Sequence, residues 1–92
     1  MKFMKFIPEY EAMTGEKVSP EVARLAELMD SVGQRFEAKG YEDASQGLTA
    51  LSNDVFQTWG INLFLDDAAM AETMADLARI YYMDGYRKGG AA

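Results

Sequence analysis

The strongest constraint on the fold is a helix start signal followed by apolar residues at helical spacing. Ser19-Pro20-Glu21 combines an N-cap serine, a proline that needs no N–H in the first turn, and an acid favoured at a helix N-terminus. Apolar residues then recur every three or four positions and would share one side of that helix: Val22, Leu25, Met29, Val32 and Phe36. Gly40 offers a C-terminal stop, so the pattern predicts a helix over residues 19–39.

A second helix is predicted over residues 43–60. Asp43 is a plausible N-cap with Gln46 three residues later, and Gly60 would end or kink the helix. Five residues would form its apolar side: Ala44, Leu48, Leu51, Val55 and Trp59.

A third helix is predicted over residues 66–85. Asp66-Asp67 places two carboxylates where a helix N-terminus favours them, and Gly85 would end the helix. Its apolar side would consist of Met70, Met74, Leu77 and Tyr81.

Residues 1–18 are expected to begin extended and to form a short helix at about Pro8 to Met13, with a turn at Gly15. The aromatic and aliphatic residues of this segment would share a helical face only if Pro8 allowed the turn. Short connections between the helices favour antiparallel neighbours, and 92 residues leave room for one core. We therefore expect an all-α fold with one domain over residues 1–92: a small antiparallel three-helix bundle, an N-terminal segment packed on it, and a tail at 86–92.

The absence of cysteine and histidine narrows the chemistry. Without them the chain lacks thiolate ligands, the usual general base near neutral pH, and the most frequent zinc ligands. The two adjacent acid pairs, Glu42-Asp43 and Asp66-Asp67, fall where helices are expected to start, so capping accounts for them. We therefore expect neither an enzyme nor a bound metal or cofactor; an enzyme would need a pocket holding an acid with a strongly shifted pKa.

The net charge argues against nucleic acid as a direct partner. Phosphate neutralisation by basic residues supplies most of the affinity for DNA, whereas this chain carries a formal charge of −6. No apolar run approaches the roughly 20 residues that a bilayer crossing needs. We expect no membrane association and a cytoplasmic location.

The acidic residues are concentrated in one part of the chain. Residues 40–78 contain no lysine or arginine. Within that range the acids form a candidate surface for a protein partner with a basic face: Glu42, Asp43, Asp54, Asp66, Asp67, Glu72 and Asp76. The alternative is a solvated acidic surface that only keeps the protein soluble.

Several apolar side chains fall outside the predicted apolar sides. They form a second candidate surface, for a partner or for another copy of the chain: Phe56, Phe64, Ile80, Tyr82 and Tyr86. The alternative is that some of them pack beneath the N-terminal segment. Tyr82 and Tyr86, with Arg87-Lys88, could also form a contact patch or stack on a nucleotide-like ligand, unless they simply end the helix.

In size, acidity and lack of catalytic residues the chain is similar to small phage-encoded proteins that inhibit a host machine by binding it, anti-CRISPR proteins among them. This general likeness implies an inhibitor or regulator whose acidic face meets a basic surface on a partner protein. The alternative is a self-associating structural or assembly component that buries Phe56, Phe64 and Ile80 between copies. A homo-oligomer therefore remains open.

Overall fold

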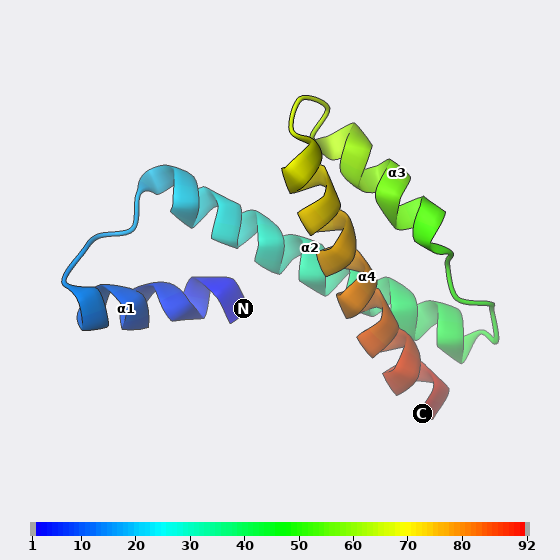
Figure 1. The fold of residues 1–92 in the computed structure, drawn as a ribbon. Coiled ribbons are helices and arrows are strands. Elements are labelled where there is room, and N and C mark those ends of the chain that lie inside the picture. Colours follow the sequence, from blue (N-terminus) through cyan, green and yellow to red (C-terminus); the bar gives the residue numbers. More distant parts are fainter. Residues whose placement is uncertain (1, 92) are drawn as a thin grey trace. The chain divides into compact units, whose positions relative to one another are not determined.

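The described part of the protein consists of helices and turns (Figure 1). The structure, a computed structural model, describes residues 2–91, with side chains from Phe6 to Ala91. Its helices are α1 (Lys2–Thr14), α2 (Pro20–Ser45), α3 (Asn53–Leu63) and α4 (Ala68–Ala91). The predicted all-helical class is confirmed, and α2 packs against α4 and α3, but a three-helix bundle is not confirmed.

The chain divides into two compact units, with the division inside α2 after Val32. The first unit contains α1 and the N-terminal half of α2. The second unit contains the C-terminal half of α2 with α3 and α4.

In the first unit, the N-terminal segment is a longer helix than the sequence suggested. α1 includes Pro8 in its interior, so the prediction of an extended start was wrong. The predicted turn at Gly15 is confirmed, because this glycine has a φ of 72° and its N–H donates to the Glu11 carbonyl at 2.9 Å. The Glu11 carboxylate then accepts the Val18 N–H at 2.9 Å, which ties the linker back to α1.

The start of α2 follows the sequence signal, but its end does not. The Ser19 hydroxyl accepts the Val22 N–H at 3.3 Å, as expected of an N-cap. The predicted stop at Gly40 was wrong, because α2 continues to Ser45. The stop signal is instead Gly47, just after the helix, whose φ of 74° allows the Leu48 N–H to donate to the Asp43 carbonyl at 2.9 Å.

The later helix boundaries also differ from the predictions. α3 begins after Ser52, so Asp43 lies in the last turns of α2 and is not an N-cap. Neither Gly60 nor Gly85 ends its helix, since α3 runs to Leu63 and α4 runs to Ala91, through most of the expected tail. The predicted cap at Asp67 is confirmed, because its carboxylate accepts the Met70 N–H at 3.0 Å.

Glycines bring the backbones of α2 and α4 into direct contact where the two ribbons cross (Figure 1). A Cβ atom added at Gly40 would lie 2.0 Å from the Tyr82 carbonyl oxygen. A Cβ atom added at Gly85 would lie 1.9 Å from the Glu37 carbonyl oxygen. Both distances are far below van der Waals contact, so only glycine fits at these positions. The predicted stops are therefore packing positions.

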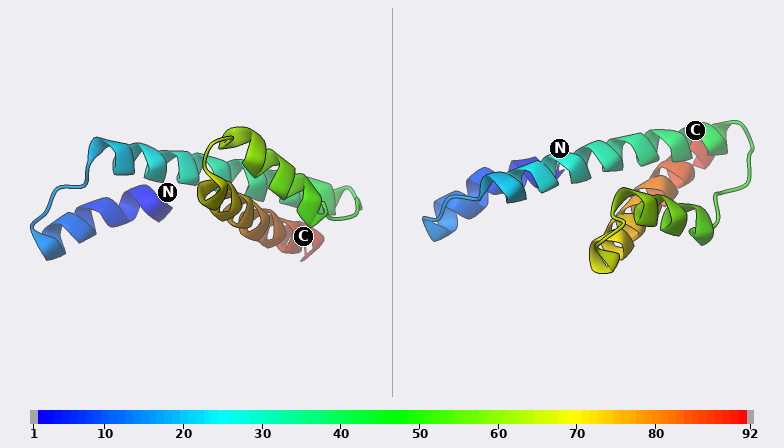
Figure 2. Two further views of the ribbon diagram at one scale, coloured as in Figure 1. Left: turned by 45° about the horizontal axis from the view of Figure 1, so that its top comes forward. Right: turned by 90° about the horizontal axis from the view of Figure 1, so that it is seen from above.

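α3 lies beside the N-terminal half of α4 and runs in the opposite direction (Figure 2). A glycine again allows two helix backbones to touch, because a Cβ atom at Gly60 on α3 would lie 2.4 Å from the Ala71 carbonyl oxygen on α4. Aromatic rings pack together in the second unit. The ring centres of Phe36 and Trp59 lie 4.9 Å apart, and those of Phe56 and Tyr82 lie 5.3 Å apart.

The buried side of α4 consists mainly of small residues. Its buried positions are Ala71, Met74, Ala75, Ala78, Tyr82, Gly85 and Gly89. Of the predicted apolar side only Met74 is among them. On α3 the predicted core residue Val55 is exposed and its neighbour Phe56 is buried. The predicted apolar sides therefore did not match the buried faces of these two helices.

The glycine contacts predict a large difference between two substitutions in α4. Gly85→Ala must push α4 away from the Glu37 backbone and should lower the free energy of unfolding by about 1–3 kcal/mol. Gly90→Ala should not lower it, because nothing beyond the helix's own backbone lies within 4 Å of the added Cβ and alanine favours a helix over glycine. Urea denaturation followed by circular dichroism measures both. Equal stability of the two variants would contradict the close approach of α2 and α4.

Candidate functional site

The structure separates the predicted acidic residues into one buried side chain and a group of exposed ones. Asp43 has only 3% of its surface exposed. The others are exposed: Glu42, Asp54, Asp66, Asp67, Glu72 and Asp76. We define these six as the acidic surface residues. They lie near the end of α2, in the first turn of α3, in the α3–α4 loop and along α4.

Most basic side chains of the second unit already pair with acids of the same unit. The Lys88 ammonium lies 2.8 Å from Glu37 on α2 and 3.0 Å from Asp84 on α4. Lys39 pairs with the buried Asp43 at 2.9 Å. Of the acidic surface residues, Asp76 has a guanidinium nearby, at a loose 4.0 Å from Arg79.

The buried carboxylate of Asp43 is held by side chains from α2 and α4. The Tyr82 hydroxyl donates to Asp43 Oδ2 at 2.6 Å, and the Lys39 ammonium lies 2.9 Å from Oδ1. The Tyr82 oxygen also accepts the Leu51 N–H at 3.2 Å, so one hydroxyl connects α4 to α2 and to the segment before α3. Nearby, the Tyr86 hydroxyl donates to the Leu48 carbonyl at 2.6 Å.

These contacts shift the titration of both partners. The hydrogen bond from Tyr82, and then the one from Lys39, lower the pKa of Asp43. Burial, followed by the hydrogen bond to Asp43, raises the pKa of Tyr82 to about 12. Asp43 is thus held ionised and Tyr82 neutral, because the Asp43 carboxylate accepts the Tyr82 hydroxyl and pairs with the Lys39 ammonium. We interpret this network as structural.

The predicted apolar surface is likewise divided. Phe56 and Tyr82 are buried in the second unit, where each contacts the other, so in this structure they are not accessible to a partner. Phe64 and Tyr86 are half-buried, and the Tyr86 ring stacks on Tyr82 with the ring centres 6.0 Å apart. Ile80 is exposed on α4. Met83, also exposed on α4, was not among the predicted residues.

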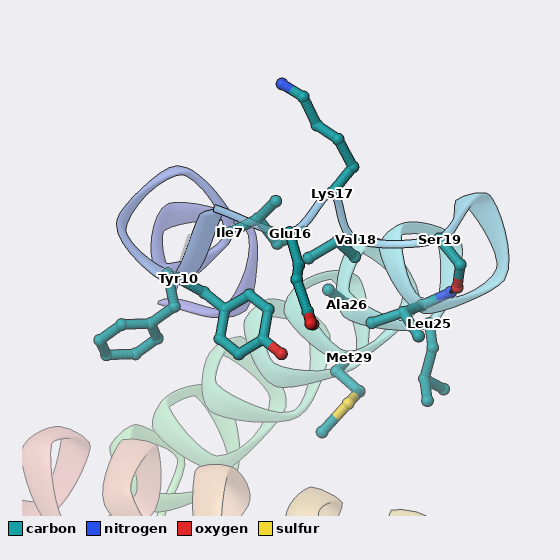
Figure 3. Close-up of a pocket in the computed structure, with 11 residues that line it drawn as sticks. Ile7, Tyr10, Glu16, Lys17, Val18, Ser19, Leu25, Ala26 and Met29 are labelled. Carbon is teal, nitrogen blue, oxygen red and sulfur yellow. Dashed lines mark hydrogen bonds between the residues drawn. The ribbon is translucent and has the colours of Figure 1, made fainter. Parts of the chain in front are cut away.

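The first unit contains an apolar pocket that the sequence did not indicate as a site (Figure 3). Its volume is about 460 Å³, within the range of small-ligand sites. α1 contributes Phe6, Ile7 and Tyr10, while Val22, Leu25, Ala26 and Met29 come from α2. In Figure 3 the Glu16 carboxylate points down toward Met29, and the Lys17 ammonium points away. The apolar residues at positions 6, 7 and 10 are the sequence signal for this pocket, and they share a helical face because α1 continues through Pro8.

Within residues 2–91, no cluster of three or more acidic side chains is arranged to hold a metal ion. Of the four described helices, none has both the length and the apolar character that a bilayer crossing requires. Comparisons with protein families, curated proteins and solved structures find no significant match to this chain.

The Asp43–Tyr82 contact predicts a loss of stability when the hydroxyl is removed. Tyr82→Phe keeps the ring against Phe56 but leaves the Asp43 carboxylate with one partner fewer and the Leu51 N–H without its acceptor. Leaving buried polar groups unsatisfied should lower the free energy of unfolding by about 1–3 kcal/mol. Tyr41→Phe is the matched control, because Tyr41 is exposed.

The same contact determines the alkaline limb of the stability profile. The pKa of Tyr82 is raised from 10.0 to about 12 in the folded protein. The stability that the neutral Tyr82 hydroxyl adds to the folded state is therefore fully present below pH 10 and is lost as the pH rises toward 12. Urea denaturation at a series of alkaline pH values should show a smaller decline for Tyr82→Phe than for the wild type or Tyr41→Phe. Identical slopes would mean that Tyr82 does not titrate abnormally.

Proposed function

We propose that this protein acts without catalysis, by binding a partner protein through its acidic surface residues. The observation that supports the proposal is the distribution of ion pairs in the second unit. Lys39 and Lys88 are held by acids of the same unit, whereas Asp54, Asp66 and Glu72 form no ion pair among the described residues. The unit therefore presents negative charge that its own cations do not neutralise.

A basic surface on a partner protein would complement this charge. Glu72 and Asp76 lie one turn apart on α4 and repel each other, which destabilises a helix by a few tenths of a kcal/mol. A cation placed between them would remove that repulsion and would also speed association through long-range attraction. If the partner is a machine that handles nucleic acid, the acids could occupy the positions of phosphates and block its site. The phage-inhibitor role and the cytoplasmic location stay predictions.

The pocket of the first unit favours a second candidate function, the binding of an apolar ligand. Its walls come from both helices of that unit, and its apolar lining is typical of sites that take up hydrophobic groups. The polar groups at its edge, such as the Tyr10 hydroxyl and Glu16 carboxylate, could orient such a ligand.

Charge reversal on α4 tests the acidic surface. Glu72→Lys with Asp76→Lys should leave the helical circular dichroism unchanged, because both side chains are exposed, and should sharply weaken partner binding. Proteins captured from the native host by the wild type identify the partner, which is then titrated against the wild type and the double variant at low and moderate salt.

The matched control reverses acids that lie outside the acidic surface. Glu21→Lys with Glu27→Lys changes the charge equally at two exposed positions of the first unit and should leave partner binding nearly unchanged. Wild-type affinity should fall as salt rises. Unchanged affinity in the folded α4 variant, without salt dependence, would leave the acids as a solubility feature.

Filling the pocket tests the second candidate. Val22→Trp adds an indole at an exposed residue of the pocket wall. It should reduce binding of anilinonaphthalene sulfonate, a fluorescent dye with an apolar ring system and a charged sulfonate, measured by fluorescence titration. Val55→Trp places the same side chain at an exposed position of α3 and should bind the dye like the wild type. Equal dye binding by both variants would exclude the pocket as the binding site.

A further inference from the structure

The outward face of α4 carries an ordered series of exposed side chains. Asp76, Ile80, Met83 and Arg87 are spaced four, three and four residues apart, so they lie along one line on the side opposite the buried alanines and glycines. Ile80 is 57% exposed and Met83 is 43% exposed. The Asp76 and Arg87 side chains, at 61% and 78%, extend into solvent on either side of this apolar pair.

The series is symmetric about its own midpoint. Read from either end, a charged residue is followed by two apolar residues and a second charged residue, and the two charges are opposite. Beyond them, Thr73 and Gly90 continue the line at equal distances from the midpoint, and both are small. When two copies of this helix lie antiparallel, each charged residue of the series therefore faces one of opposite charge, and each apolar residue faces an apolar one.

We propose that α4 pairs in antiparallel orientation with α4 of a second copy, around a two-fold axis between Ile80 and Met83. In this arrangement Ile80 packs against Met83 of the second copy, and Asp76 meets Arg87. Two-fold symmetry produces each contact twice. The small residues Thr73 and Gly90 face each other at both ends, where nothing beyond the helix's own backbone lies within 4 Å of a Cβ added at Gly90.

Charge complementarity selects the antiparallel orientation. Parallel pairing in register would place Asp76 against Asp76 and Arg87 against Arg87, which is repulsive. Arg87 already pairs with Asp84 on the same helix, but its guanidinium has five N–H donors and can bind a second carboxylate. Among the described residues, the cation that pairs with Asp76 is Arg79, at a distance of 4.0 Å.

This pairing differs from the burial of Phe56 and Phe64 between copies that the sequence suggested. Phe56 is in the core and Phe64 is half-buried, whereas Ile80 remains available and gains Met83 as its counterpart. One helix face from each copy is a small interface, so association should depend on protein concentration and weaken with salt.

Sedimentation equilibrium over a range of protein concentrations tests the pairing through a charge exchange. The wild type should change from monomer to dimer as its concentration rises. Asp76→Arg and Arg87→Asp each place like charges opposite one another at both ends, and each should raise the dimer dissociation constant at least about tenfold. The double variant Asp76→Arg with Arg87→Asp restores opposite charges and should regain dimerisation.

Asp54→Arg is the matched control, because it reverses an exposed acid on α3 and should leave the dissociation constant unchanged. Circular dichroism establishes that every variant is folded. A wild type that stays monomeric up to millimolar concentration would overturn the proposal. So would a dimer that the single exchanges leave intact, or a folded double variant that fails to recover.

The outcome is independent of the proposed acidic binding surface. Arg87→Asp removes a base and adds an acid, so it should leave binding of a basic partner unchanged or stronger while it weakens self-association. Conversely, the double variant with exchanged charges should regain the dimer although Asp76 is no longer acidic.

Discussion

The contact between the backbones of α2 and α4 is the constraint on which the second unit depends. Side chains normally keep helix backbones apart. Gly40 on α2 and Gly85 on α4 have only a hydrogen atom in place of a side chain, so the two helix backbones touch. Gly89 extends the contact, since a Cβ atom there would lie 2.4 Å from the Tyr41 carbonyl oxygen. Because the two helices meet this closely, the side chains beside the glycines are brought to fixed partners across the contact.

The polar network around Asp43 follows from that approach. The backbone of Tyr82 on α4 lies against Gly40 on α2. The Tyr82 hydroxyl therefore reaches the carboxylate of Asp43, which lies near the C-terminal end of α2. An acid near a helix C-terminus is opposed by the helix dipole, and burial adds a further cost. Hydrogen bonding to Tyr82 and pairing with Lys39 offset both effects, while the Leu51 N–H is satisfied by the same hydroxyl.

This arrangement gives α4 two different faces. The buried face uses small residues so that α2 and α3 can approach closely, and it places no large apolar group where a partner could reach it. The outward face carries Glu72 and Asp76 on its N-terminal half and the apolar pair Ile80 and Met83 further along. Both proposals for the second unit concern this outward face, but they differ in the role they give to Arg87.

The sequence by itself determined the helical class and the helix starts at Ser19-Pro20 and Asp67, because capping depends on local hydrogen bonds between neighbouring residues. It also showed the exposed acids. Only the tertiary structure decided the core faces and several helix ends, since a glycine in a sequence reads equally as a stop or as a packing position. Gly40, Gly60 and Gly85 were packing positions, whereas Gly47 with its left-handed φ was the stop. Asp43 was expected to cap a helix but is a buried acid bound by Tyr82. This contact could not be predicted from a local pattern, because the two residues are 39 positions apart in the sequence.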